Sequence, residues 1–362
     1  MNRMQKLIAV AALSILAASL SFAQQPNLTN GKLEPASAAG GLDASLHRIA
    51  GTDVGPVWIG YAVPLVDSSK PRTICCGNYI IGDGSSSCCG ACSLESDNYS
   101  NGNAQGACIQ DTPQTHLVVF LRYSQGQVTR VRAMTPNCGV DAAGLTVHWL
   151  TDVRPSDSVA ALTALVEGKG TSSEHYVTDS AIMSLALHAD PSADSALSRL
   201  VAAEQPEKVR EKTAFWLAVE RGRSGFPLLQ KLAREDSNSS FRSKLAFDLS
   251  LSKEPEAIPE LIRMLHQDSD GRVRSQALFW LAQKAGKKAA AEVSNAIEND
   301  PDTEVKKKAV FALSQMHDEG VTKLIEVART NRNREVRRQA IFWLGQSRDP
   351  RATAFIEEVL TK

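Results

Sequence analysis

The sequence has no excess of charge of either sign. Lysine and arginine together number 40, as do aspartate and glutamate, and the formal net charge is zero. Proteins that bind nucleic acid usually carry a basic patch that neutralises phosphates. The charge balance therefore predicts no nucleic-acid partner. The apolar share of 43% and the charged share of 22% are those of a globular protein.

Motifs for common chemistries are also lacking. The sequence contains no P-loop, no dinucleotide-binding glycine fingerprint, no G-x-S-x-G and no H-E-x-x-H. A c-type haem is excluded, because Ser93 follows Cys92 where a histidine is needed. We therefore expect no catalytic residue, no cofactor and no enzyme activity.

Long apolar runs are scarce, and the clearest one, residues 7–20, lies next to the start. Arg3 and Lys6 precede it, and residues 21–23 read Ser-Phe-Ala, a small-residue cleavage site. This pattern predicts a cleaved bacterial signal peptide over residues 1–23, with an uncleaved anchor as the alternative. No later run is long enough to span a membrane, so we expect a periplasmic or secreted protein.

Cysteine is absent after Cys138. The seven cysteines all lie in one stretch and are Cys75, Cys76, Cys88, Cys89, Cys92, Cys108 and Cys138. In an exported protein such clustering is typical of disulfides that stabilise a small domain without a large core. Three bridges would use six cysteines and leave one thiol, either free or paired with another chain.

Two other interpretations of the cysteines stay open. Cys89-Gly90-Ala91-Cys92 is a C-x-x-C, which serves elsewhere as a redox pair. A zinc site could use four thiolates, Cys75, Cys76, Cys89 and Cys92, although an oxidising compartment disfavours it. A thiol nucleophile would need His116 or His148 to meet Cys138 in space. We interpret the histidines as structural.

The chain divides into four predicted regions. Residues 1–23 are the signal peptide, and residues 24–50, rich in Gln, Asn, Pro, Ala and Gly, are expected to be a flexible linker. Residues 51–153 are predicted to form a small β-rich, cysteine-containing domain, and residues 156–362 an α-solenoid. The expected strands are 56–63, 117–123, 128–134 and 145–150, the middle two forming a hairpin.

One line of sequence recurs through the second half of the chain. It is clearest as Val336-Arg337-Arg338-Gln339-Ala340-Ile341-Phe342-Trp343-Leu344, and related lines start at Val177, Val209, Phe241, Val273 and Val305, spaced 32, 32, 32, 32 and 31 residues apart. A fixed period of this size is typical of stacked repeats. We expect six helix pairs from residue 158 and a lone final helix, about 351–360, that closes the stack.

The recurring line has a consistent buried face. If its first residue is position zero, positions zero, four, five and eight fall within an arc of about 140° at ~100° per residue. Position four is mostly small, which lets helices approach closely, and position eight is leucine in all six lines. Asp- and Asn-rich turns precede the second helix of each pair and are expected to cap it.

Turns of this kind followed by Val-Arg-x-x-Ala-x-x-x-Leu make residues 156–362 similar to HEAT repeats of the short bacterial type, related to phycobilin-lyase-like units. The resemblance implies an α-solenoid that presents an extended surface to other molecules. It also implies that Arg210, Arg242 and Arg274, at position one, join turn aspartates in a ladder between repeats. The HEAT-like hydroxylases use His-Glu pairs, and this chain has only His317-Asp318, so that activity is not expected. Bilin-lyase activity is not expected either, because export would separate the protein from a cytoplasmic substrate.

Position six departs from the family pattern. It holds Met183, Phe215, Phe247, Phe279, Phe311 and Phe342, although it points to ~240°, nearly opposite the middle of the buried arc. These residues predict an apolar ladder along the concave surface that binds a protein or peptide. The alternative is that they pack between second helices or under the amino-terminal domain. Trp216, Trp280 and Trp343, at position seven, are expected to belong to the core.

The sequence thus predicts an exported, non-enzymatic adaptor. A small disulfide-stabilised β domain would precede an α-solenoid whose inner surface binds a protein partner. The alternative is a thiol-redox or zinc-binding protein that uses the cluster from Cys75 to Cys138, with the repeats as a surface that holds the substrate.

Overall fold

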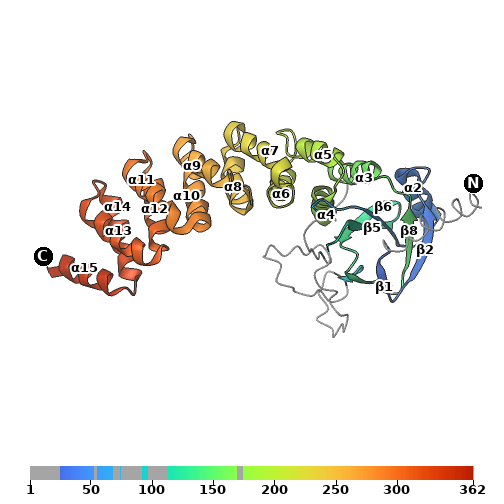
Figure 1. Cartoon of the computed structure of the whole chain (residues 1–362), viewed down its shortest axis with the longest axis horizontal. Coiled ribbons are helices and arrows are strands. Elements are labelled where there is room, and N and C mark those ends of the chain that lie inside the picture. The colour runs from blue at the N-terminus through green and yellow to red at the C-terminus, as the bar shows by residue number, and fades with distance from the viewer. Residues whose placement is uncertain are drawn as a thin grey trace, which may run out of the picture. The chain divides into compact units, whose positions relative to one another are not determined.

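The computed structural model describes residues 25–52, 55–67, 74, 92–96, 113–168 and 174–361. Within these ranges the chain forms a β-sheet region followed by a succession of helices (Figure 1). It divides into two compact units, residues 1–200 and residues 201–362. Each unit is described by itself. No helix among the described residues is both long enough and apolar enough to cross a bilayer.

The first unit is built on a five-stranded mixed sheet. Its strands, in spatial order, are β2 (Lys32–Ser37), β8 (Thr146–Thr151), β3 (Val57–Pro64), β5 (His116–Ser124) and β6 (Gln127–Met134). The pairs β2–β8 and β8–β3 are parallel, whereas β3–β5 and β5–β6 are antiparallel. The same unit contains a second, smaller parallel sheet, whose strands in spatial order are β1 (Asn27–Thr29), β7 (Gly139–Asp141) and β4 (Cys92–Ser93).

The predicted hairpin is confirmed as β5 and β6. The two residues between the strands, Gln125 and Gly126, have φ values of 52° and 73°. Positive φ at both positions is what a tight two-residue hairpin turn requires, because its twist then matches that of the strands. The buried residues of β5 are the five apolar or aromatic residues 117–121 and Tyr123.

The stretch expected to be a flexible linker carries ordered elements instead. Strand β2 pairs with β8, more than a hundred residues later in the chain, and such a pairing leaves no local trace in the sequence. Helix α2 (Leu42–Thr52) buries Leu42, Leu46 and Ile49. Their spacing of four and three residues places them on one helical face, which is a local pattern that the prediction overlooked.

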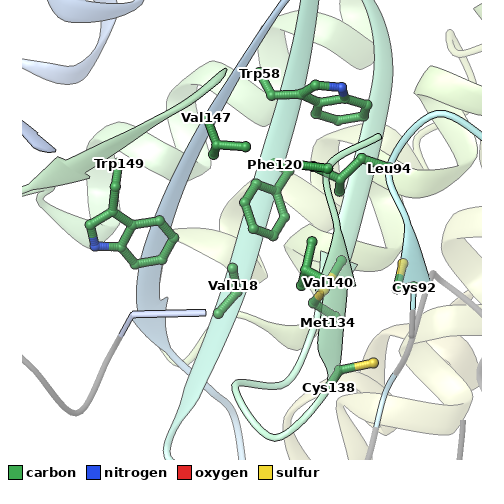
Figure 2. Close-up of a cluster of buried hydrophobic side chains, with 11 residues drawn as sticks. Trp58, Cys92, Leu94, Val118, Phe120, Met134, Cys138, Val140, Val147 and Trp149 are labelled. Carbon is green, nitrogen blue, oxygen red and sulfur yellow. The ribbon is translucent and has the colours of Figure 1, made fainter. Parts of the chain in front are cut away.

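A cluster of buried side chains covers one face of the large sheet (Figure 2). Trp58, Phe120 and Trp149 fill its centre, and the rings of Phe120 and Trp149 lie 6.3 Å apart. Gly60 sits directly under them: a Cβ atom there would lie 2.6 Å from the Phe120 ring. The absence of a side chain at this residue therefore makes room for the aromatic packing.

Three helices follow in the same unit: α3 (Pro155–Glu167), α4 (Glu174–Leu187) and α5 (Ser192–Leu200), of which α3 and α4 contact the sheet. Helix α3 packs on α2 and β3, and α4 packs on β5 and β6. The buried Ser158 hydroxyl donates to the Tyr61 hydroxyl over 2.9 Å and lies 3.1 Å from His188 Nε2. The first helix pair thus belongs to the compact unit of the sheet. The predicted boundary between residues 153 and 156 stays a prediction.

The second unit consists of helices. They are α6 (Glu207–Glu220), α7 (Gly222–Glu235), α8 (Ser239–Leu251), α9 (Ala257–Gln267), α10 (Gly271–Ala285), the short η2 (Gly286–Ala289), α11 (Ala290–Asn299), α12 (Thr303–Ser314), α13 (His317–Thr330), α14 (Arg334–Gln346) and α15 (Pro350–Thr361). The recurring line falls on α6, α8, α10, α12 and α14, and each of these packs on the next. With α3 to α5 they make the six predicted pairs, and α15 follows alone. The predicted fold class is confirmed.

The predicted caps are found where the turns precede these helices. The side chain of Asn238 accepts from the backbone N–H groups of residues 240 and 241, and Asp270, Asp302 and Asn333 act in the same way on α10, α12 and α14. Each cap satisfies an N–H group that the helix itself leaves unpaired. The turn chemistry therefore fixes where each second helix begins.

Candidate functional site

The phenylalanines at position six form a row on the second helices of the second unit. Phe215, Phe247, Phe279 and Phe311 are partly exposed, and Phe342 is 53% exposed. Each lies on a different helix, from α6 to α14, and these helices are packed side by side. Met183 differs, because it is 3% exposed on α4, the helix that packs on β5 and β6. Five of the six predicted residues thus reach solvent.

The rings form two groups. In what we call the front group, Phe215 contacts Trp216 at 5.1 Å and Phe247 at 6.4 Å, Phe247 contacts Trp280 at 4.7 Å, and Phe279 contacts Trp280 at 4.9 Å. Centroid distances in this range are those of favourable aromatic pairs. The rings therefore pack between neighbouring helices, as the alternative interpretation had it, and yet keep an exposed part.

The rear group, as we call it, comprises Phe311, Phe342 and Trp343. The ring of Trp343 lies 4.9 Å from that of Phe311 and 5.0 Å from that of Phe342. Its indole N–H is buried without a hydrogen-bond acceptor in the described part of the chain. Trp216 is buried, as expected for a core residue, whereas Trp280 and Trp343 are partly exposed. The tryptophans at position seven thus belong partly to the surface.

A ladder of buried ion pairs holds these helices in register. Arg242 donates to both carboxylate oxygens of Asp268 over 2.8 Å, and Arg274 to those of Asp300 over 2.8 and 3.0 Å. Arg210 pairs with one carboxylate oxygen of Asp236 through Nη2, while its Nε donates to the carbonyl of residue 201. Burial is the largest influence and would raise the pKa of Asp268, but the hydrogen bonds and charge of Arg242, with the backbone N–H of Asp270 and the charge of Arg263, together hold the pKa below its ordinary value. The structural role expected for these three arginines is confirmed.

The arginines also tie the turns of their own repeats. Arg242 Nη1 donates to the carbonyl of residue 236 over 2.6 Å, and Arg274 Nη1 to that of residue 268 over 2.9 Å. Each guanidinium thus joins its own turn to the next one. A planar group with five donors suits such double contacts, and a lysine could not replace it.

One residue of the face was missed by the sequence interpretation. Asp248 occupies position seven of α8, where α6, α10 and α14 carry tryptophan, and it is 4% exposed. Burial, and next the charge of Glu211, raise its pKa well above the ordinary value, while Lys244 opposes the shift. An acidic residue in a position otherwise occupied by tryptophan was the available signal. It marks a place beside the front group where the surroundings favour the neutral form of a carboxyl group.

A cavity of about 290 Å³ lies where α9, α10 and α11 meet. Its polar lining includes Asp268, Arg274 and Asp300, which are already engaged in the ladder. His266, at the same place, bonds to Glu292 over 2.6 Å. The cavity is therefore a gap between ladder residues whose polar groups have partners.

Two of the seven predicted disulfide residues are described. Cys92 and Cys138 are each 2% exposed and belong to the core of the first unit (Figure 2). The remaining residues of the disulfide and zinc predictions, Cys75, Cys76, Cys88, Cys89 and Cys108, lie outside the described residues. Bridge connectivity, the C-x-x-C interpretation and the zinc interpretation stay predictions.

The described histidines have structural surroundings. His188 is fully buried beside Ser158, His148 lies 3.8 Å from the Glu34 carboxylate on the paired strand, and His116 contacts Thr115 over 2.8 Å. Burial lowers the pKa of His116. Over the residues described, no three His, Cys, Asp or Glu side chains are grouped so that they could hold a metal ion.

Comparison with known proteins agrees with this geometry. The family model described as HEAT repeats matches residues 197–282, 226–314 and 290–362. No curated protein matches the chain.

Several solved structures are similar to the chain. The complex of CpcE and CpcF of phycocyanin lyase from Nostoc sp. PCC7120 is 21% identical over 44% of this chain and 100% of that one, with a TM-score of 0.33. Human deoxyhypusine hydroxylase in complex with glycerol is 13% identical over 56% and 90%, with a TM-score of 0.30. YibA of E. coli is 18% identical over 57% and 82%, with a TM-score of 0.34.

The family match covers five of the six helices that carry the recurring line, together with the capped turns and the arginine–aspartate ladder. Residues 197–362 are therefore HEAT repeats.

Proposed function

We propose that this protein is an exported, non-enzymatic scaffold that binds a protein or peptide through the concave side of its second helices. The observation that carries the proposal is the row of phenylalanines on α6 to α14, which keep exposed surface at a position that the buried face does not require. Exposed apolar rows on a rigid array usually mark an interaction surface.

The ring contacts favour tight binding. Each half-buried ring is held by a neighbouring tryptophan or phenylalanine, so it loses little conformational freedom when a partner covers it. Pre-organised aromatic side chains supply most of the affinity in many interfaces. HEAT repeats serve in general as protein-interaction scaffolds, and the charge balance gives no reason to expect a nucleic-acid partner.

Export and disulfide stabilisation belong to the same proposal. They are supported by the signal-like pattern of residues 1–23 and by the complete burial of Cys92 and Cys138 in the core. The intact mass of the exported protein, alkylated with and without reduction, tests both. Loss of residues 1–23 and protection of six cysteines are expected. Four or more thiols alkylated without reduction would contradict disulfide stabilisation of the first unit.

The binding function is tested by peptide selection on the mature chain. Peptides selected by display should bind wild-type protein at least tenfold more tightly than Phe279→Ala, because a central aromatic contact is lost. Tyr176→Ala is the matched control, since Tyr176 is 74% exposed on α4 of the other unit and should leave affinity unchanged.

Circular dichroism must accompany the titrations. If Phe279→Ala binds as wild type does while its helicity is intact, the phenylalanine row is not the binding surface. If its helicity collapses, the rings are core residues and the proposed face is wrong. Phe342→Ala, at the most exposed ring, repeats the test with less risk to the fold.

A further inference from the structure

The charges beside the phenylalanines are not evenly spread. Positions two and three of each line lie one helical turn before position six and share its face. In the five lines of the second unit these ten positions hold five cations and one anion, namely Lys212, Lys244, Lys307, Lys308 and Arg338 against Glu211. The whole chain has zero net charge, so this face is basic relative to the rest.

The front of the face is locally compensated. Lys244 on α8 pairs with Glu211 on α6, and Asp248 lies buried beside them. On α10, Arg272 pairs with Asp270 and Arg274 with Asp300. Lys284 Nζ donates to two carbonyls at the end of α8 over 2.7 Å. The cations around the front group are thus engaged within the protein itself.

The rear of the face is different. Helices α12 and α14 each carry three cations and one anion. Lys307 pairs with Glu304 over 2.7 Å. The hydrogen bond to Glu304, with a smaller contribution from the charge of Glu335, raises the pKa of Lys307. Lys308 and Arg338 are exposed and make no ion pair within the described part of the chain. Two exposed cations therefore flank Phe311 and Phe342, the latter being the most exposed ring of the row.

The spacing of the first two rings of the row fits an extended chain. The centroids of Phe215 and Phe247, on adjacent second helices, are 6.4 Å apart. Alternate side chains of an extended peptide lie about 6.4–6.8 Å apart, because each residue advances ~3.2–3.4 Å. A peptide that crosses α6 and α8 in this conformation can place one apolar side chain on each of these two rings and point the intervening side chain toward positions two and three.

We propose that the partner segment is an acidic, extended peptide, whose apolar side chains pack along the phenylalanine row and whose carboxylates lie over Lys308 and Arg338 beside the rear group. This rests on the proposed function and names the partner's chemistry. Carboxylates complement the two exposed cations, while the compensated front group receives uncharged residues. The asymmetry also sets direction: the acidic end of the peptide lies over α12 and α14.

The test uses three fluorescein-labelled dodecapeptides with alternating sequences, Leu-Glu, Leu-Ser and Leu-Lys, titrated against the full mature chain. At about 20 mM salt we expect Leu-Glu to bind at least tenfold more tightly than Leu-Ser, and Leu-Lys more weakly than either. Raising the salt to about 150 mM should reduce this difference, because exposed charges are screened over a shorter distance. Each of the three peptides has the same apolar spacing.

The variant Lys308→Glu/Arg338→Glu should lose at least tenfold in affinity for Leu-Glu and gain for Leu-Lys. The control is Lys231→Glu/Lys288→Glu, which makes the same charge change at exposed residues outside the second helices and should leave the preference intact. Phe342→Ala should weaken Leu-Glu and Leu-Ser alike.

Equal binding of Leu-Glu and Leu-Ser, unaffected by the double variant but lost in Phe342→Ala, would overturn the acidic preference and leave the proposed function standing. Preference for Leu-Lys would overturn it as well. Competition by heparin that Phe342→Ala does not change would mean that an anionic polysaccharide, not a peptide, is held there. No binding of any peptide, together with no effect of Phe342→Ala on selected ligands, would overturn the proposed function itself.

Discussion

The contacts that stabilise each unit internally differ in how far apart their residues lie in the sequence. In the first unit, hydrogen bonds join residues far apart in the chain, such as Tyr61 to Ser158 and Ser37 to Asp152, separated by 97 and 115 positions. In the second unit, Arg242 and Asp268 are separated by 26. The first unit therefore forms only when distant segments meet, whereas the second grows by contacts between adjacent repeats.

The largest expected effect on stability comes from breaking one of the buried ion pairs between repeats of the second unit. Arg242→Ala removes one partner of a buried pair and leaves Asp268 charged and desolvated, which typically costs about 3–5 kcal/mol. Urea unfolding followed by far-ultraviolet circular dichroism measures it. The double variant Arg242→Met/Asp268→Leu should recover most of the loss, because apolar residues can replace a buried pair. A single-variant cost below 1 kcal/mol would contradict the ladder's role.

A smaller effect is expected in the first unit. Ser158→Ala removes the hydroxyl between Tyr61 and His188, all three of them buried, and leaving buried polar groups unsatisfied costs about 1–3 kcal/mol. In a background where Trp216, Trp280 and Trp343 are replaced by phenylalanine, emission comes only from Trp58 and Trp149 and reports the first unit, whereas helicity reports mainly the second. If the comparison holds, the loss moves the tryptophan transition and not the helical one of the repeats. Equal movement of both would show that the units unfold together.

The pH dependence of the second unit should depend on Asp248. Its folded-state pKa is raised, so the contribution of this residue is full below the unfolded value and is lost as pH rises through the folded one. Asp248→Asn should therefore be more stable than wild type at neutral pH and equal to it under strongly acidic conditions. Urea titrations over a pH series measure the difference. Asp268, with its lowered pKa, has the opposite sign, and its contribution is lost as pH falls.

The smallest effect is expected from an exposed tie between repeats. Arg223, with a side chain 77% exposed, pairs with Glu254 at 3.2 Å and with Glu256 at 3.4 Å. Exposed pairs contribute about 0–1 kcal/mol, since water screens them. Arg223→Ala should change the free energy of unfolding by less than about 0.5 kcal/mol. A loss as large as that of Arg242→Ala would mean that burial does not distinguish the ties.

The same difference in reach explains what the sequence could predict. The helix pairs, the capped turns and the arginine ladder follow from residues within one period of each other. The parallel pairing of β2 with β8 joins segments more than a hundred residues apart. Helices α3 and α4 likewise pack on strands that lie outside their own repeat. For that reason Met183 is buried although it shares position six with exposed phenylalanines.

Within the candidate site, the helical period predicted the row of rings but not how they pack. Contacts such as Phe247 with Trp280 cross from one helix to the next, and their geometry depends on how closely the helices approach. The raised pKa of Asp248 likewise depends on burial and on Glu211 of a neighbouring helix. The environment of each side chain depends on the neighbouring repeats, so it cannot be read from the sequence of one repeat.

The arginine–aspartate ladder does not extend to the last repeats, so we expect local unfolding of the array to begin at its carboxyl-terminal end. Lys306 and Arg337, in the described part of the chain, bond to the carbonyls of residues 298 and 331 rather than to a carboxylate. Repeats separate neighbour by neighbour, so amide hydrogens of α14 and α15 should exchange with solvent before those of α8 and α10. A ligand on the rear group would slow this exchange, because binding to the closed form lowers the population of the open one.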